Sequence, residues 1–332
     1  MAQAMGRRFG AVAALAVAGI MGLAACQPVP PGGTDPGAPT TTSTTSTTAP
    51  TPTTTPGTKA GWTLVGGDEF NGTAVDTTKW KAYNNTYGDG NNEMACLTPG
   101  NVSEAGGTLN ITSRKEQVTC PGGKVRQYTS GFLGSREAGK YYPKFARFEM
   151  RAKLPHAQGL WPAFWLRHRD GGSGQAEVDI MEEFHALRPG QTSGTLHLDT
   201  RRNLVQRSAP FEAPTANPGW HTWAVEISPG TNGGVRFVYS IDDKTYLDYT
   251  DTVHQWTNTD PAATWDIAVN QAVGGTWTGG PDDTLGYLRD LNKCSLGGTA
   301  PSGCVTTGIR RVDWTQPAAA TYQVDWIRVY TH

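Results

Sequence analysis

The chain has 332 residues, with 28 Lys and Arg against 29 Asp and Glu, and a formal net charge of −1 at pH 7. Its basic residues form no stripe, which argues against a nucleic-acid partner. The 41 Gly and 22 Pro indicate many turns. The 11 Trp and 11 Tyr supply flat surfaces, which pack in protein cores and also stack on sugar rings.

The first 25 residues have the pattern of an export signal. Arg7 and Arg8 precede an apolar run from Phe9 to Met21, which is too short to span a membrane and suits the core of a signal peptide. The stretch LAAC at 23–26 resembles the lipobox of bacterial lipoproteins. The resemblance implies cleavage before Cys26 and a lipid on its thiol; a plain secretory signal with an incidental Cys is the alternative. We expect an exported protein, at the cell surface or extracellular, that meets the membrane through this lipid only.

Residues 26–60 form the next segment, which includes TTTSTTSTTAPTPTTTP and has almost no bulky apolar side chain. Such a segment cannot bury enough surface to offset its loss of conformational entropy, so it should be a disordered tether. The remaining segment, 61–332, has a length that suits one large all-β domain.

The five cysteines are an odd number for an exported protein, which agrees with lipid attachment at Cys26. Cys96, Cys120, Cys294 and Cys304 remain, and four cysteines allow three pairings. Short loops favour Cys96–Cys120 and Cys294–Cys304. Their spacings match no zinc pattern.

Short segments of alternating apolar and polar residues fill the domain, and clusters of Gly, Pro, Asn and Asp separate them. The segments are GTLNITSR (107–114), FARFEMRAKL (145–154), EVDIMEEF (177–184), SGTLHLDT (193–200), HTWAVEIS (221–228), VRFVYSID (235–242), WDIAVNQ (265–271) and YQVDWIRVY (322–330). Many short strands with such turns predict a β-sandwich or barrel.

Trp161 and Trp165 lie four residues apart in GLWPAFWLR, on one face of a predicted strand. On an exposed face they would form a platform for a chain of sugars. Two core tryptophans are the alternative.

The strand EVDIMEEF carries four carboxylates in eight positions. Strict alternation puts Glu177, Asp179 and Glu183 on one face and sends Glu182 into the core. Burying Glu182 there would cost several kcal/mol unless it were paired or neutralised.

A β-bulge near Ile180–Met181 removes this conflict. One extra residue shifts the alternation, so that Glu182 joins Glu177 and Asp179 while Met181 turns to the core. Glu183 then points to the opposite side. The apolar run of this strand favours the bulged register.

The bulge brings three acids together. Glu177 and Glu182 would be four strand steps apart, roughly 13 Å between Cα atoms. Converging side chains could bring the carboxyls to about 5–5.5 Å, the separation found in retaining glycosidases. With Asp179 between them, at least one pKa should rise, as a general acid requires. A calcium site is the alternative, but it would normally draw on loop carbonyls, which a strand does not supply.

The motif EVDIME resembles the Glu-x-Asp-x-x-Glu signature of glycoside hydrolase family 16. The resemblance covers nearly all of 61–332, because further segments follow the family's order. They are DEFNG (68–72), NNE (91–93), FEMRAKLP (148–155), WPAFWL (161–166), GTLHLD (194–199), WHTWAVE (220–226), VNQAVGG (269–275) and VDWIRVY (324–330). The implied fold is an all-β, concanavalin-like jelly roll, with two antiparallel sheets and a concave substrate cleft.

The resemblance implies a role for each acid. Glu177 would be the nucleophile, and Glu182 the general acid and then the base. Asp179 would hold a proton or hydrogen bond between them and tune Glu177. His197 would lie beside this cluster; a structural His on a strand is the alternative. Glu183 is expected to be a structural or rim residue.

The resemblance also implies residues that bind the substrate or a metal. Trp161, Trp165 and Trp277 would form aromatic walls, and Asn92 would bond sugar hydroxyls. No cofactor is expected for catalysis. A structural Ca²⁺ is expected at three ligands from distant segments, although a terminal carboxylate could simply be solvated; the ligands are Glu69, the carbonyl of Gly107, and Asp325.

The bulged motif most resembles the β-1,3-glucanases of the family, or laminarinases, although galactan hydrolases share the bulge. Laminarinases usually place a Trp-Pro pair just before the motif; here the stretch is GGSGQA, so the rim of the cleft differs. The main hypothesis is therefore a monomeric, retaining endo-hydrolase of a β-linked polysaccharide. A transglycosylase with the same residues stays open. A non-catalytic sugar-binding module predicts the loss of one acid, and all three are present.

Overall fold

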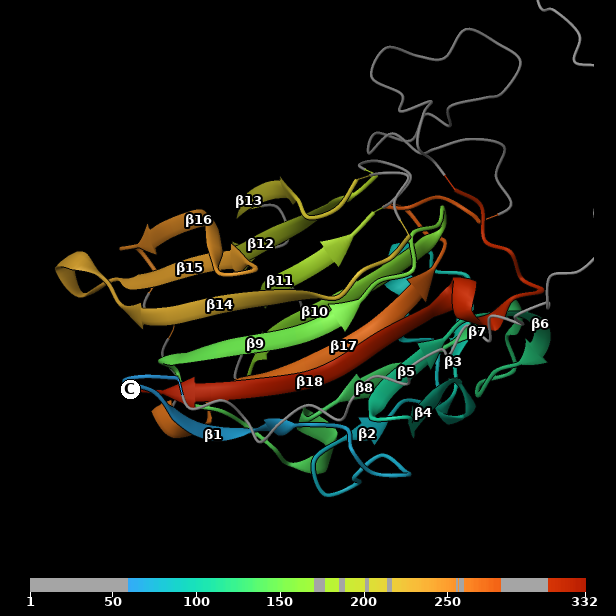
Figure 1. Ribbon diagram of the computed structural model, residues 1–332, viewed down its shortest axis with the longest axis horizontal. Helices are drawn as coiled ribbons and strands as arrows, with labels where there is room; N and C mark the ends of the chain where they lie inside the picture. Colours follow the sequence, from blue (N-terminus) through green and yellow to red (C-terminus); the bar gives the residue numbers. More distant parts are fainter. Residues whose placement is uncertain are drawn as a thin grey trace, which may run out of the picture. The chain divides into compact units, whose positions relative to one another are not determined.

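Two antiparallel sheets pack face to face in the computed structural model (Figure 1). It describes residues 59–169, 177–184, 189–200, 203–213, 217–254, 256, 260–281 and 310–332. These residues belong to the compact unit Thr48–His332, while the unit Met1–Thr47 lies outside the described residues. Cys26, Cys294 and Cys304 are not among the described residues, so the predictions for them fall outside the structure described here. No helix within the described ranges is long and apolar enough to cross a bilayer.

One sheet has eight strands. Its main path runs in the order β16 (Lys244–Asp251), β15 (Val235–Ile241), β14 (His221–Pro229), β9 (Ala146–Lys153), β18 (Thr321–Thr331), β5 (Thr108–Thr112) and β4 (Val102–Ala105), and β1 (Thr63–Asp68) also pairs with β18.

The other sheet has seven strands and carries the acid motif. Its order is β13 (Asn203–Pro210), β12 (Gln191–Thr200), β11 (Glu177–Glu183), β10 (Leu160–His168), β17 (Trp265–Val273), β8 (Phe132–Gly134) and β2 (Lys81–Ala82). The predicted all-β sandwich is confirmed.

Smaller elements complete the described part of the chain. A third sheet has the order β3 (Ala95–Leu97), β7 (Val125–Ser130) and β6 (Arg114–Thr119). The 3₁₀ turns are η1 (Tyr87–Asn91), η2 (Pro99–Asn101), η3 (Arg136–Ala138), η4 (Thr231–Gly233), η5 (Pro261–Ala263) and η6 (Pro317–Ala320).

The core lies between the two large sheets and follows from alternation along their strands. On β9, Phe148, Met150 and Ala152 are fully buried and belong to the main apolar cluster, whereas Arg151 between them is half-buried. Strand β11 contributes its apolar residues to the same cluster. Because burial of apolar surface is the main stabilising force, this packing fixes which side of β11 faces the cleft.

The predicted Cys96–Cys120 disulfide is present, with a Cα–Cα distance of 5.8 Å. It joins β3 to the tip of the hairpin formed by β6 and β7. Since β3 directly follows the segment 85–94, the crosslink holds that segment against the hairpin.

Replacing both cysteines, in a Cys96→Ser/Cys120→Ser variant, should lower the free energy of unfolding by about 3 kcal/mol, because the unfolded chain regains the entropy of an open loop. Urea titration of the oxidised parent and the variant measures this difference. The result is contradicted if the oxidised parent and the variant unfold at the same urea concentration.

Candidate active site

A β-bulge in β11 determines the direction of its carboxylates, as the apolar spacing predicts. Asp179 pairs with Trp165 on β10, but the next β10 residue in the ladder, Phe164, pairs with Met181, so Ile180 is the extra residue. The register on the β12 side shifts between Asp179 and Glu182 as well. Ile180 and Met181 are both buried in the core, and the acids before and after them reach the same cleft.

The first two acids meet a histidine from β12. Nε2 of His197 lies 3.1 Å from Oδ2 of Asp179 and 3.6 Å from Oε1 of Glu177. Asp179 is almost fully buried, whereas the side chain of Glu177 keeps 28% of its surface exposed. Glu177 is therefore the more accessible of the two carboxylates, and His197 lies beside them.

The third acid, Glu182, has two polar neighbours. Nε1 of Trp161 donates to Oε1 at 3.1 Å, and the hydroxyl of Thr195 donates to Oε2 at 3.5 Å. Burial raises the pKa of Glu182 well above its ordinary value, and the charges of Asp179 and Glu177 raise it further. These causes outweigh the two hydrogen bonds, which favour the ionised form. Glu182 therefore holds a proton at pH values where an ordinary carboxyl has lost it.

Two tyrosines from the opposite sheet support the bulge, and the sequence did not reveal them. The hydroxyl of Tyr246 lies 3.5 Å from the carbonyl oxygen of Ile180, and that of Tyr239 donates to the carbonyl of Thr195 at 3.1 Å. Both rings pass over Gly194, where a Cβ would lie 2.7 Å from Cδ1 of Tyr239 and would also meet the Tyr246 hydroxyl. Gly194 in SGTLH was the one sequence feature that could have indicated a close approach of other side chains to this strand.

The fourth acid of the motif, Glu183, is fully buried and is absent from the cleft lining. Its Oε1 lies 3.6 Å from Nδ1 of His156, whose Nε2 lies 2.5 Å from Oε2 of Glu212. Burial alone would lower the pKa of His156, but the two carboxylates outweigh burial and raise it. Glu183 therefore lies in the interior beside His156 and not in the cleft, as expected for a structural residue.

The acids lie in a cleft with a cavity volume of about 160 Å³. Trp161 and Trp165 line it from β10, and Trp277 packs on the cluster that contains Trp161. Further lining residues are Tyr87, Asn91, Glu93, Phe132, Ala163, Phe184, Thr195, Leu204, Gln206 and Asn270.

Asn92, predicted to bond sugar hydroxyls, is exposed and is not part of this lining. Its amide donates to the hydroxyl of Thr276 at 3.0 Å. Its neighbour Asn91 lines the cleft instead, because the chain turns at Asn92 in the left-handed region, with φ +58°.

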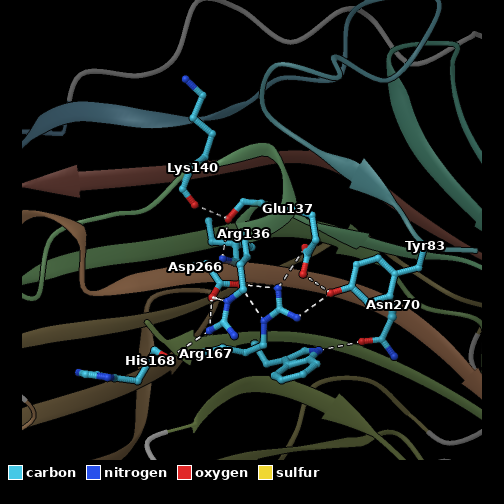
Figure 2. Close-up of polar contacts among 11 residues, drawn as sticks. Tyr83, Arg136, Glu137, Lys140, Arg167, His168, Asp266 and Asn270 are labelled. Carbon is cyan, nitrogen blue, oxygen red and sulfur yellow. Dashed lines mark hydrogen bonds and ion pairs between the residues drawn. The ribbon is translucent and has the colours of Figure 1, made fainter. Parts of the chain in front are cut away.

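Trp165, which lines the cleft, contacts a charged network around Arg167, and Figure 2 shows the polar contacts of this network. Nε of Arg167 donates to Oδ1 of Asp266 at 2.8 Å, and its Nη1 donates to the hydroxyl of Tyr83 at 2.8 Å. The guanidinium lies 5.6 Å from the ring of Trp165, whose Nε1 donates to Oδ1 of Asn270 at 2.7 Å. The orientation of Trp165 is therefore fixed from two sides.

The residues predicted to bind calcium have other partners. Both carboxylate oxygens of Glu69 accept bonds from Arg328 at 2.8 Å, and Asp325 pairs with Arg151. Gly107 has a positive φ of +75° in its turn. Two guanidinium groups would repel a dication, so this donor set does not fit Ca²⁺. The calcium site stays a prediction, and the described contacts argue against it.

Comparison with known proteins agrees with this geometry. The family model described as glycosyl hydrolases family 16 matches residues 90–287. A beta-glucanase from Rhodothermus marinus is 32% identical over 239 residues, which cover 66% of this chain and 78% of that protein. Glucan endo-1,3-beta-glucosidase A1 from Niallia circulans is 32% identical over 299 residues, 82% of this chain but only 38% of the relative's length.

Among solved structures, an endo-beta-1,3-glucanase from Pyrococcus furiosus aligns with a TM-score of 0.62 and 26% identity. The alignment covers 81% of this chain and 94% of that chain. The matched family model includes the whole acid motif and both of its neighbouring strands. The chain therefore belongs to glycosyl hydrolases family 16.

Proposed function

We propose that the protein is a retaining endo-glycoside hydrolase that acts on β-1,3-glucan by double displacement. One observation carries the proposal: the bulge brings Glu177, Asp179 and Glu182 into a single aromatic-lined cleft, where burial and the neighbouring carboxylates raise the pKa of Glu182. A pair of carboxyl groups, one ionised and one protonated, is what retaining glycosidases use.

In the first step, the carboxylate of Glu177 attacks the anomeric carbon and forms a glycosyl ester. The bond from that carbon to the leaving oxygen breaks, and Glu182 gives its proton to this oxygen. Asp179 and His197 lie beside the nucleophile and orient it. Nε2 of His197 is within 3.6 Å of the carboxylates of Glu177 and Asp179.

In the second step, Glu182 is ionised and takes a proton from a water molecule that attacks the anomeric carbon. The ester bond breaks, Glu177 regains its carboxylate and Glu182 regains its proton, so the site returns to its starting state. Trp161 and Thr195 stabilise the ionised Glu182 between the steps, because both donate hydrogen bonds to it.

The relatives' names support the choice of substrate. The Niallia circulans relative is a glucan endo-1,3-beta-glucosidase, and the Pyrococcus furiosus structure is an endo-beta-1,3-glucanase. Because this chain spans less than half of the first of these, its natural substrate rests on the shared catalytic part. Attachment at a cell surface through Cys26 remains a prediction from the sequence.

The Glu177→Gln variant should lose laminarin hydrolysis by a factor on the order of 10³ or more, because an amide cannot form the glycosyl ester. The measurement is the release of reducing ends from laminarin, mixed-linkage glucan and galactan. Glu226→Gln, the same change on β14 in the opposite sheet, is the matched control and should keep full activity. A parent that cleaves galactan and leaves laminarin intact would contradict the proposed substrate.

The pH dependence of kcat should show the raised pKa of Glu182. Since the general acid must be protonated, kcat should fall as pH rises through this raised pKa, above the range of an ordinary carboxyl. Asp179→Asn removes a neighbouring negative charge, so the alkaline limb of its normalised profile should move to lower pH. An alkaline limb at the same pH in both proteins would contradict this account of Glu182.

A further inference from the structure

Glu183 is the acid of the motif that the proposed mechanism does not use. Its side chain is fully buried on the side of β11 that faces away from the cleft. An ionised carboxyl in such a place is strongly unfavourable without a positive partner. The ring of His156 faces it, with Nδ1 3.6 Å from Oε1 of Glu183. Because Glu183 directly follows Glu182 in β11, whatever fixes Glu183 also fixes the backbone of the proposed general acid.

The imidazole of His156 lies between two carboxylates. Its Nε2 is 2.5 Å from Oε2 of Glu212, while its Nδ1 faces Glu183. An ionised carboxylate only accepts hydrogen bonds, and a neutral imidazole donates from one nitrogen only. Two donors on one ring require the positively charged imidazolium. The pKa of His156 is raised in agreement, because the two carboxylates outweigh the effect of burial.

Glu212 continues this row of charges toward the surface. Its Oε1 accepts a hydrogen bond from the backbone N–H of Gly219 at 2.6 Å and lies 3.8 Å from Nε2 of His221. Nδ1 of His221 is 2.7 Å from Oδ2 of Asp242, whose side chain is 47% exposed. His156 thus has two acids in direct contact, and a second imidazole and a third acid lie beyond Glu212.

The sheet holds the end of β11 by its backbone on one side only. In the described part of the two strands, the ladder between β10 and β11 ends at the pair Ala163–Glu182. On the other side, Thr192 of β12 still pairs with Glu183. On the β10 side, the contact between His156 and Glu183 therefore takes the place of further backbone pairing.

This contact joins the segments that carry the acid and its hydrogen-bond donor. His156 lies just before β10, which contains Trp161, and Glu183 ends the neighbouring strand β11 (Figure 1). Phe184, next to Glu183, packs on Trp161 with ring centroids 5.1 Å apart, and Trp161 donates to Glu182. A shift of Glu183 would therefore move Glu182 directly and Trp161 through Phe184.

We propose that the ion pair of Glu183 and His156 positions the general acid Glu182, by fixing the end of β11 against the segment before β10. Glu183 acts through the strand and lies outside the cleft lining, so it is a positioning residue. The inference rests on the proposed function, because it needs Glu182 as the general acid.

The pair depends on pH through His156. Since its pKa is higher in the folded protein than in the unfolded chain, its contribution to stability is complete below the ordinary pKa of histidine. The contribution is lost as pH rises through the raised pKa. At higher pH, Glu183 stays ionised in the interior opposite a neutral ring.

The test compares the parent with His156→Gln, Glu183→Gln, the double variant and a control, His254→Gln. The control also removes an imidazole that faces a buried carboxylate, since Nδ1 of His254 is 2.9 Å from Oδ2 of Asp251, but this pair lies at the end of β16 in the opposite sheet. For each protein, kcat and KM for laminarin, the alkaline limb of the kcat profile and the urea midpoint of unfolding are measured.

His156→Gln leaves the charge of Glu183 without its positive partner. Its kcat should fall by a factor on the order of 10², with KM near the parent's, because the general acid is displaced. The alkaline limb should move to lower pH, since Glu182 loses part of its buried surroundings. In the double variant two amides can bond each other, so most of kcat should return. Glu183→Gln should show a smaller loss, and His254→Gln should match the parent.

A lower urea midpoint in His156→Gln with unchanged kcat and alkaline limb would overturn the proposal, because a purely structural pair predicts that result. A double variant that folds but loses as much kcat as His156→Gln would overturn it too. If His156→Gln does not fold, Glu183→Gln decides, and parent values of kcat and of the alkaline limb in that variant contradict the positioning role.

The urea midpoints test the pair apart from activity. As pH rises through the raised pKa of His156, the parent should lose stability relative to the double variant. A difference that stays constant with pH would overturn the ion pair. A parent that leaves laminarin intact would overturn the proposed function and the positioning role with it, whereas the urea series would still decide whether the ion pair exists.

Discussion

The position of one extra residue in β11 governs the chemistry of the site, because side chains on a strand alternate between its faces. Regular pairing would bury Glu182 and send Glu183 to the cleft. With Ile180 bulged, two consecutive apolar residues enter the core and Glu182 reaches the cleft. The favourable burial of Ile180 and Met181 therefore also places Glu182, the proposed general acid, in the cleft. Tyr246 and Tyr239 support the same bulge from the opposite sheet.

The site combines a group of close carboxylates with an aromatic surface whose orientation is fixed. Burial, together with the crowding of carboxylates that would destabilise an ordinary strand, raises the pKa of Glu182 here. The repulsion between these carboxylates is unfavourable, and the packing of the sandwich offsets it. Strands β10 and β17, for example, pair without interruption from Leu160 to His168. Arg167 and Asn270 then fix Trp165, so that the aromatic surface stands at a defined place relative to the acids.

The sequence predicted what depends on local patterns. The bulge followed from the spacing of Val178, Ile180 and Met181, and the jelly roll from short strands and a family resemblance. Contacts between distant segments were not predictable: the support of the bulge by Tyr246, and the arginines that pair with Glu69 and Asp325, require knowledge of which strands are neighbours. The sequence pointed to Asn92, whereas its neighbour Asn91 lines the cleft, and the left-handed turn at Asn92 could not be read from the sequence.

The most direct test of the account is to trap the covalent intermediate with a 2-deoxy-2-fluoro laminaribiosyl fluoride and locate the label by peptide mass spectrometry. The fluorine slows both steps, and the good leaving group lets the first one proceed, so the glycosyl ester accumulates. The account predicts one sugar per protein, attached to Glu177. A label on Glu182 or Glu183, or complete turnover through an inverting reaction without any label, would contradict it.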